Sequence, residues 1–536
     1  MPPGAGKSLL AALCAVAALA CRVELEGAAC DVPGATDQCP DGQACGNDRK
    51  CSERALACAA TRCTPGAVLC RGEAWWGCTA ADEVCGTLAE KLADCAGQGL
   101  ECGGVEGTCR CPAGGPVFAV DPVGSGAGGL APTGAETNPA CGFATLGEAL
   151  AAAGSYAGSA VVRVVSPPAS GSFSLAPADV PLTVPAGVTL ESATPTAPGG
   201  WIIETADAVN GATEPAIVHL AAGAAIRGFT IRNQLATPAV TPSGSAVLCD
   251  DAAGTLSHLS IETNNLSWGV RLTGTCAATL DSVAVYGPRK AALSVETLSG
   301  VFPQVVGGSF TGRAPAPDPV TQPGHGVWVR SGGVAIRAPD GVAFSQLAGT
   351  FSGGAPAELS GSTGAGLRSD DYTSTAISVS LDRVRIAGNG AAGAYLSQLP
   401  AGSTVSIRSS QVEGNAGWPY EFGRTGGGVV LVSAFVPDLT FKGNRVWANA
   451  GDQVGLWLDS STTTVVDLSG GDPVLGCADP VNQARANVFG CGSGNDVYST
   501  TKEAPVSAVL NYWKGVPRVT AVDFSNACSW EPPLCP

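Results

Sequence analysis

Short stretches of alternating apolar and polar residues recur along most of the chain, and a turn precedes each of them. In 184–190 a Pro-Ala-Gly turn leads directly into Val, Thr and Leu. The same cue returns at 224–231, 256–261 and 280–285. Period-two alternation that Gly, Asn or Pro interrupts at a fixed repeat is typical of strands that wind into a solenoid. The pattern therefore predicts an all-β repeat array from about 182 to 515.

Asparagines mark expected corners of this array. Asn389 and Asn415 stand 26 residues apart, at the ends of Ile-Ala-Gly-Asn and Val-Glu-Gly-Asn. Because asparagine tolerates the left-handed conformation, we expect both to adopt it and to stack into a ladder that Asn444 and Asn449 extend. Segments rich in Pro and Gly interrupt the period and are expected to protrude as loops on one side: 313–323, 352–366 and 416–428.

A capping helix is expected in the entry segment 112–180, ahead of the array. A strand pattern at 117–121 is followed by a short helical pattern at 143–153. Thr145 is a good N-cap, and Glu148 three residues later completes a capping box. The apolar residues of this helix fall on one face: Leu146, Ala149, Leu150 and Ala153. We expect this face to cover the open end of the first coil, since exposed strand edges invite pairing.

The order of these elements resembles the beginning of the pectin-lyase-like right-handed parallel β-helix proteins, in particular an uncharacterised bacterial surface group among them. The shared order is a strand, a Phe-x-Thr-Leu-x-x-Ala-Leu helix, a valine-rich strand and a Val-Pro-Ala-Gly-Val-Thr-Leu turn. Asn-Tyr-Trp at 511–513, followed by Gly515 and Pro517, resembles the closing motif of the same proteins. The resemblance implies a right-handed parallel β-helix over 181–517 and a C-terminal tail over 518–536.

Composition agrees with a repeat array and narrows the partners. The chain has 536 residues with Gly 73 and Pro 38, and only 14% are charged. Its hydrophobic content of 45% is enough for a continuous core. The net charge is −16, and the sequence contains no cluster of basic residues. Both observations argue against binding to nucleic acid and against electrostatic binding to an anionic membrane.

Residues 1–21 have the pattern of an export signal. Lys7 supplies a positive start, 9–19 is apolar, and Ala-Leu-Ala-Cys ends at Cys21. This ending resembles the lipobox of bacterial lipoproteins, which implies that Cys21 is acylated and that the mature chain is held at the outer membrane or cell surface. Ordinary cleavage and secretion is the alternative. We expect no transmembrane helix, so membrane contact would come through the lipid anchor only.

A cysteine-rich module follows at 22–111. Thirteen cysteines lie between Cys30 and Cys111, a density that exported chains use for disulfides. The region holds no Cys-x-x-Cys pair and no histidine, so a cystine scaffold is favoured over a zinc site. The module resembles small Cys-rich modules of bacterial surface lipoproteins.

The parity of the cysteines predicts several bridges. Without Cys14 and Cys21 the chain keeps 20 cysteines, an even number, whereas the module alone has an odd number. We therefore expect Cys141 to pair back with the module. Cys249 and Cys276, 27 residues apart, would bridge neighbouring coils. Local loops near the end would be closed by two further bridges, Cys477 with Cys491 and Cys528 with Cys535.

Enzymes with this fold are, as the resemblance implies, mostly polysaccharide lyases and glycoside hydrolases. Asp370 with Asp371, and His325 between two glycines, resemble polygalacturonase elements, but here the histidine precedes the Asp pair and no Asn-Thr-Asp exists. A lyase would need acidic residues around Ca²⁺, for which Asp382 is available. We expect no catalytic site, cofactor or metal. If the chain is an enzyme, Asp370, Asp371 and Asp382 are the catalytic candidates.

Aromatic residues suggest binding instead of catalysis. Trp418 and Tyr420 lie in a predicted loop, where their rings would either stack on sugars or anchor the loop. Trp328 and Trp457 have apolar neighbours in alternation, which assigns them to the core.

The sequence thus predicts an exported, lipid-anchored surface protein with a non-catalytic β-helix that serves a structural or recognition role. Its expected partner is a polysaccharide or another surface protein. The alternative is a polysaccharide lyase or glycoside hydrolase with divergent active-site residues.

Overall fold

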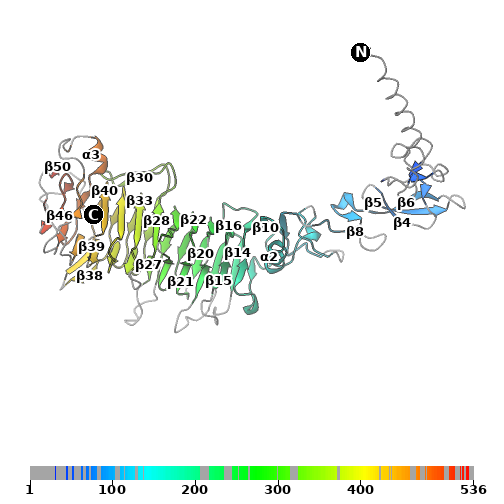
Figure 1. Ribbon diagram of the computed structural model, residues 1–536, viewed down its shortest axis with the longest axis horizontal. Coiled ribbons are helices and arrows are strands. Elements are labelled where there is room, and N and C mark those ends of the chain that lie inside the picture. The colour runs from blue at the N-terminus through cyan, green and yellow to red at the C-terminus, as the bar shows by residue number, and fades with distance from the viewer. Residues whose placement is uncertain are drawn as a thin grey trace, which may run out of the picture. The chain divides into compact units, whose positions relative to one another are not determined.

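Figure 1 shows the computed structural model of the chain. The chain forms two compact units, Met1–Gly115 with Gly124–Gly142, and Pro116–Val123 with Phe143–Pro536. The structure describes residues 31, 44–45, 51–52, 62–63, 68–71, 74–80, 86–102, 109–113, 115–126, 131–136, 138–205, 216–233, 244–250, 253–263, 266–298, 300–313, 324–370, 375–421, 424–433, 435, 437–458, 466–470, 477, 480–499, 506–513, 519–520, 522–523 and 527–529.

The first unit is held by disulfides and short antiparallel pairs. Its described bridges are Cys70–Cys102, Cys95–Cys109 and Cys111–Cys141. Trp75 and Leu100 pack among these cysteines in a small core. Its elements are β1 (Ala44–Cys45), β2 (Cys51–Ser52), β3 (Arg62–Cys63), β4 (Val68–Arg71), β5 (Ala74–Ala80), β6 (Gly86–Asp94), η2 (Ala96–Gln98), β7 (Glu101–Cys102), β8 (Cys109–Arg110) and η4 (Pro139–Cys141).

Cys141 therefore bridges to Cys111, but the bridge is internal to the first unit. Residues Gly124–Gly142 cluster with that unit rather than with the remainder of the expected entry segment 112–180. The physical reason is the short Asn138-capped turn that carries Cys141, whose side chain is fully buried in the disulfide core.

The second unit is built from three parallel sheets, and successive coils of the chain add one strand to each sheet in rotation (Figure 1). Among the described residues the first sheet contains, in spatial order, β9 (Val117–Val120), β10 (Ala160–Val164), β13 (Val188–Ser192), β16 (Ala225–Arg227), β19 (Thr255–Ser257), β22 (Thr279–Asp281), β25 (Gln304–Val306), β28 (Gly333–Arg337), β33 (Ser378–Asp382), β36 (Thr404–Arg408) and β40 (Asp438–Lys442).

The second sheet contains β11 (Ser172–Ser174), β14 (Ile202–Thr205), β17 (Thr230–Asn233), β20 (Ser260–Thr263), β23 (Ala284–Tyr286), β26 (Ser309–Thr311), β31 (Ala357–Ser360), β34 (Val384–Ala387), β37 (Gln411–Glu413), β41 (Arg445–Trp447), β44 (Val488–Gly490), β47 (Tyr512–Trp513) and β50 (Cys528–Ser529). The third contains β12 (Leu182–Val184), β15 (Ala216–Leu220), β18 (Ser245–Cys249), β21 (Trp268–Gly274), β24 (Ala291–Thr297), β27 (His325–Ser331), β32 (Leu367–Asp370), β35 (Ala394–Ser397), β39 (Arg424–Ser433), β42 (Asp452–Leu458), β45 (Val497–Ser499) and β48 (Val519–Thr520).

This rotation of strands through three parallel sheets confirms the predicted parallel β-helix. The last coils replace the first sheet by a short parallel one, and two hairpin excursions leave the coils. The remaining elements are β29 (Ala343–Ser345), β30 (Thr350–Ser352), β38 (Trp418–Glu421), β43 (Val466–Asp467), β46 (Val506–Ser507), β49 (Val522–Asp523), η5 (Pro177–Asp179) and α3 (Pro480–Arg485).

Inward side chains form continuous apolar columns. Val162, Leu190, Ile226, Leu256 and Leu280 occupy the same inward position of the first sheet in successive coils, and each is fully buried. Burying such a side chain contributes about 1.5–3 kcal/mol. The alternation seen in the sequence is therefore the alternation between this core and the outer faces of the sheets.

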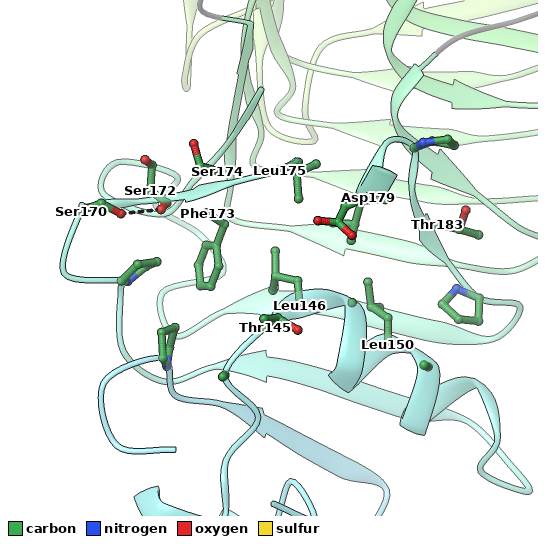
Figure 2. A pocket seen from close by; sticks show the side chains of 18 residues that line it. Thr145, Leu146, Leu150, Ser170, Ser172, Phe173, Ser174, Leu175, Asp179 and Thr183 are labelled. Carbon is green, nitrogen blue, oxygen red and sulfur yellow. Dashed lines mark hydrogen bonds between the residues drawn. The ribbon is translucent and has the colours of Figure 1, made fainter. Parts of the chain in front are cut away.

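The helix α2 (Leu146–Gly154) closes the first coil. Thr145 Oγ1 accepts a hydrogen bond from the Glu148 N–H at 3.2 Å, as the capping box predicts. Leu146 and Leu150 are buried with the other residues of the predicted face, and α2 packs on β9, β10, β12 and β13. Figure 2 shows these leucines opposite Phe173 and Leu175, across a cavity of about 630 Å³. The capping role of the helix is confirmed.

Single left-handed residues turn the chain between the first and second sheets. His258, Ser282 and Arg383 have φ of 50°, 55° and 56° at this corner. The N–H of each reaches a carbonyl of the next coil, as in the 2.9 Å bond from His258 to Asp281. At the corner between the second and third sheets, Gly388 and Gly414 take the left-handed conformation instead.

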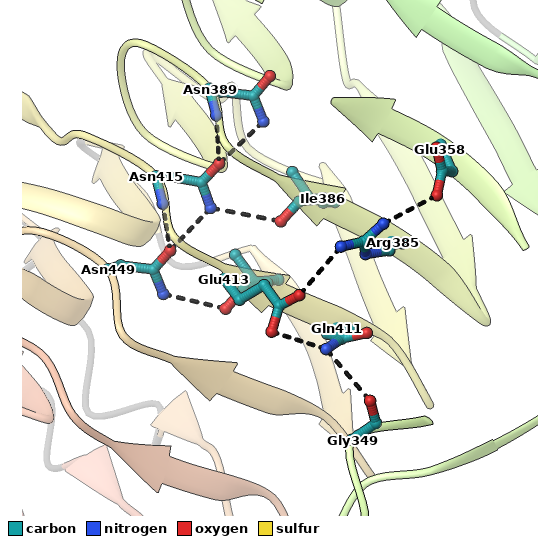
Figure 3. Close-up of polar contacts among 10 residues, drawn as sticks. Gly349, Glu358, Arg385, Ile386, Asn389, Gln411, Glu413, Asn415 and Asn449 are labelled. Atoms are coloured by element: carbon teal, nitrogen blue, oxygen red, sulfur yellow. Dashed lines mark hydrogen bonds and ion pairs between the residues drawn. The ribbon is translucent and has the colours of Figure 1, made fainter. Parts of the chain in front are cut away.

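The asparagines follow these left-handed residues and do not adopt the conformation themselves, so that part of the expectation is wrong. The expected stacking is confirmed (Figure 3). The Asn389 N–H and Nδ2 both donate to Asn415 Oδ1, at 3.1 and 2.9 Å, and Asn415 donates to Asn449 in the same way. Asn449 donates to Gln453 Oε1. Asn444 belongs to a separate ladder with Asn487 and Asn511.

Disulfides also join coils of the second unit. Cys249 and Cys276 form a buried bridge with a Cα separation of 5.9 Å. Near the end, Cys477 pairs with Cys528 rather than with Cys491, and this bridge excludes the expected pairing of Cys528 with Cys535. The cause is the pairing of β50 with β47, which places Cys528 beside Tyr512. The Tyr512 hydroxyl donates to the Cys477 carbonyl and so keeps Cys477 close to Cys528.

Several predicted features lie outside the described residues: the leader 1–21 with Cys21, Asp371, the side chain of Tyr420, and Cys535. In the part of the chain that the structure describes, no helix is long and apolar enough to cross a membrane.

Removing one amide from the first ladder should destabilise the β-helix. Asn415→Ala removes the Asn415 Oδ1 acceptor of the Asn389 N–H and Nδ2 and the Nδ2 donor to the Ile386 carbonyl, whereas Asn449 Oδ1 keeps its bond from the backbone N–H of residue 415. Each buried donor or acceptor that loses its hydrogen-bond partner lowers the free energy of unfolding by about 1–3 kcal/mol. Urea unfolding should show a clearly lower midpoint than for Gln304→Ala, which removes an exposed amide. Equal midpoints would show that the ladder contributes nothing.

Candidate functional site

Aromatic and charged side chains gather on the outer face of the third sheet. Val327 and Val329 lie in the core, so Trp328 between them points outward. Leu456 and Leu458 are buried in the same way, and Trp457 is 37% exposed. Trp328 is nevertheless buried, at 5% exposure, because it packs with Trp268 and Ala291 in a separate small cluster. The assignment of Trp457 to the core is wrong, because its apolar neighbours occupy the inward positions and place it outside.

Trp328 is the centre of this group. Its ring lies 5.6 Å from that of Trp268 on β21 and 5.5 Å from His325 on its own strand. The guanidinium groups of Arg368 and Arg330 lie over it at 4.5 and 5.5 Å. We call these residues, with Tyr395 and Trp418, the aromatic patch. Trp328, Trp268 and His325 are almost fully buried, so the half-buried rings of Tyr395 and Trp418 are the ones that can stack on a flat ligand.

A hairpin carries Trp418 onto the patch. Strand β38 turns back antiparallel to β39 and pairs Trp418 with Gly426, within the segment 416–428 where a loop is expected. The half-buried Trp418 ring lies 5.7 Å from Tyr395 and 6.3 Å from His325. The structure thus brings the predicted binding residue Trp418 together with the histidine of the hydrolase-like motif.

Asp370 is part of the same group but is fully engaged. Arg368 donates to its Oδ2 through Nε and Nη2, at 3.1 and 2.6 Å, and Trp328 Nε1 donates to its Oδ1. An acid or base carboxylate must have an oxygen within reach of the substrate. Asp370 instead orients Arg368 against the tryptophan ring.

The structure does not unite the catalytic candidates that it describes. Asp382 lies on β33 of the first sheet and pairs with Arg383 at 2.9 Å, whereas Asp370 lies on β32 of the third sheet. Across the described ranges, no three or more His, Cys, Asp or Glu side chains converge as metal ligands.

His325 is the buried member of the patch. Its side chain is fully buried, Nδ1 accepts a hydrogen bond from the Ala365 N–H at 3.0 Å, and Nε2 lies 2.9 Å from Arg368 Nη1. Burial, with the charge of Arg368, lowers the pKa of His325 to about 3. The imidazole is therefore neutral at ordinary pH and joins β27 to the next coil. Burial also raises the pKa of Tyr395, which stays a neutral phenol.

Two other hollows contain none of the predicted site residues. The cavity beside α2 is lined mainly by apolar side chains and prolines, with the Asp179 carboxylate among them (Figure 2). A shallow depression of about 450 Å³ surrounds Arg385, which bridges Glu358 and Glu413 on the second sheet (Figure 3).

Sequence reasoning missed Arg368 and Tyr395, although a signal was present. Both stand in the outward column that continues from Trp328 to the next coils. Counting outward positions from the buried Leu367 and Leu396 would have found them.

Acid should destabilise the folded protein through His325. The unfolded histidine takes up a proton below about pH 6.5, whereas the folded one does so only near pH 3. The free energy of unfolding should therefore fall as the pH is lowered between these values, by up to about 1.4 kcal/mol per unit. Denaturant unfolding between pH 6.5 and 5 should show this slope, and His325→Gln should flatten it. An unchanged slope in the variant would contradict the burial of a neutral ring.

No family model and no curated protein matches the chain. Among solved structures it is similar to the Dettilon tailspike protein, at 12% identity over 76% of this chain and 68% of that one, with a TM-score of 0.38. It is also similar to the A-module of the mannuronan C-5 epimerase AlgE6 from Azotobacter vinelandii, at 13% identity over 72% of this chain and 96% of that one, with a TM-score of 0.32. Function therefore has to be argued from the chain's own residues.

Proposed function

We propose that the protein is an exported, lipid-anchored surface protein whose β-helix recognises a polysaccharide without cleaving it. The observation that carries the proposal is the aromatic patch, in which residues from successive coils meet on one outer face. A polymer lying along the stack would contact several coils at once, spaced about 4.8 Å apart.

The chemistry of the patch supports recognition. Ring faces stack on the apolar faces of sugars, and arginine side chains supply donors for hydroxyl or acidic groups. The half-buried Trp418 and the exposed Trp457 offer accessible rings on the same sheet. Arg368 is fixed by Asp370, so its orientation requires no ordering when a ligand binds.

The arrangement of the titratable groups supports a non-catalytic role. Glycoside hydrolysis uses two carboxyl groups that face the substrate from either side. Here Asp370 has both oxygens engaged, His325 is sealed, and Asp382 stands on another sheet. The surface location follows from the leader pattern, and disulfides in both units are consistent with an oxidising compartment outside the cytoplasm.

A lyase or hydrolase is the second candidate, because Tyr395, His325 and Arg368 bring titratable groups together on one face. A lyase with Ca²⁺ bound near Asp382 belongs to this alternative. Chain cleavage is the result that would favour it.

A polysaccharide array tests both candidates with the mature, oxidised protein, with and without Ca²⁺. We expect retention on at least one polymer, with no new reducing or unsaturated ends. Trp418→Ala should weaken retention at least severalfold, whereas Tyr286→Ala, which removes an exposed ring from the second sheet, should leave it unchanged. New chain ends would contradict the non-catalytic proposal. The absence of any retention would contradict recognition itself.

A further inference from the structure

Three cations gather beside the aromatic patch, around a single carboxylate. Arg271 on β21 donates to Glu296 on β24 through Nε and Nη2, at 3.3 and 3.1 Å. Arg330 on β27 lies 3.1 Å from Glu296 Oε1, the oxygen that also accepts from Arg271 Nε. Lys290 stands at the start of the same coil as Glu296, immediately before β24.

Lys290 is the exposed cation of this group. It has no ion pair within the described ranges, and the two arginines near it share the Glu296 carboxylate. Burial is the main cause that lowers the pKa of Lys290, and the charges of Arg330 and Arg271 lower it further. The chain as a whole has a net charge of −16, so a group of three cations differs from the average of the molecule.

Two of the cations lie over tryptophan rings. Lys290 Nζ lies 5.3 Å from the centre of the Trp268 ring, and Arg330 lies over Trp328. The two tryptophans contact each other and are almost fully buried, whereas Lys290 is exposed. The rings support the cations at the surface. The backbone N–H of His325 donates to the Lys290 carbonyl at 2.7 Å, and this bond joins the turn at Lys290 to the next coil.

We propose that Lys290, Arg271 and Arg330 form an anion subsite that binds the carboxylate or sulfate of an acidic glycan. Planar guanidinium groups match such oxyanions, and a mobile ammonium group supplies the additional charge. The subsite adjoins Trp328, so an acidic group bound there would place the neighbouring sugars over the aromatic patch. This inference rests on the proposed recognition function and names the class of its ligand.

The test compares three immobilised polymers with the full, oxidised protein: a polyuronate, a sulfated polysaccharide and a neutral polysaccharide. We expect Kd to be lower for at least one acidic polymer than for the neutral one, and to rise as NaCl increases from 50 to 200 mM. The difference between the polyuronate and the sulfated polymer identifies which oxyanion the subsite prefers.

Variants assign the effect to the subsite. Lys290→Gln, an exposed change that the fold tolerates, should weaken binding to the acidic polymer about three- to tenfold and reduce its salt dependence. Arg408→Gln removes an exposed cation from the first sheet and should leave Kd unchanged.

Three results would overturn the inference while leaving the recognition function intact, provided that Trp418→Ala still weakens retention. They are equal binding of acidic and neutral polymers, an unchanged Kd for Lys290→Gln, and equal losses for Lys290→Gln and Arg408→Gln. Binding of duplex DNA as tight as that of the acidic glycan would also overturn it, since the site would then be a general polyanion surface. Failure of every polymer to bind would overturn both proposals.

Discussion

The pairing of each coil with the next is the constraint on which the rest of this structure depends. A strand in a β-helix satisfies its backbone groups only through the coils above and below it, so every coil must keep the register of its neighbours. Inward positions must therefore stack apolar side chains, as Leu190, Ile226 and Leu256 do. Corners repeat a left-handed conformation, which different residues adopt, and buried asparagines satisfy the backbone where the chain turns. Outward positions do not need to stack apolar side chains, so their residues can vary from coil to coil.

Freedom at the outward positions makes the third sheet different from the other two. Trp268, Trp328, Tyr395 and Trp418 are far apart in the sequence. The coils stack Trp328, Arg368 and Tyr395 in one column and bring Trp268 against Trp328, and the β38–β39 hairpin brings Trp418 to Tyr395. Ion pairs orient the arginines beside the rings, since Asp370 binds Arg368 and Glu296 binds Arg271. The same stack that supplies stability thus presents a rigid outer surface, which favours recognition because little ordering is needed on binding.

The sequence predicted the features that local chemistry or the repeat period decides. The capping box of Thr145 and Glu148, the stacking of Asn389 on Asn415 and the array itself are of this kind. The exposure of Trp457 was misjudged because it depends on which neighbours form the core. Pairing of Cys477 with Cys528 was not predictable, since it depends on where the last coils end. The engagement of Asp370 depends on Trp328, a coil away, which no local pattern specifies.

The central claim is that the outer face of the third sheet is the binding surface. Hydrogen–deuterium exchange of the oxidised protein, with and without the polysaccharide that it retains most strongly, tests this directly. Slower exchange in the β38–β39 hairpin and in the turn before β24 is the predicted result. Protection confined to the first sheet, to the β29–β30 hairpin or to the first unit would contradict the claim, as would unchanged exchange throughout the chain.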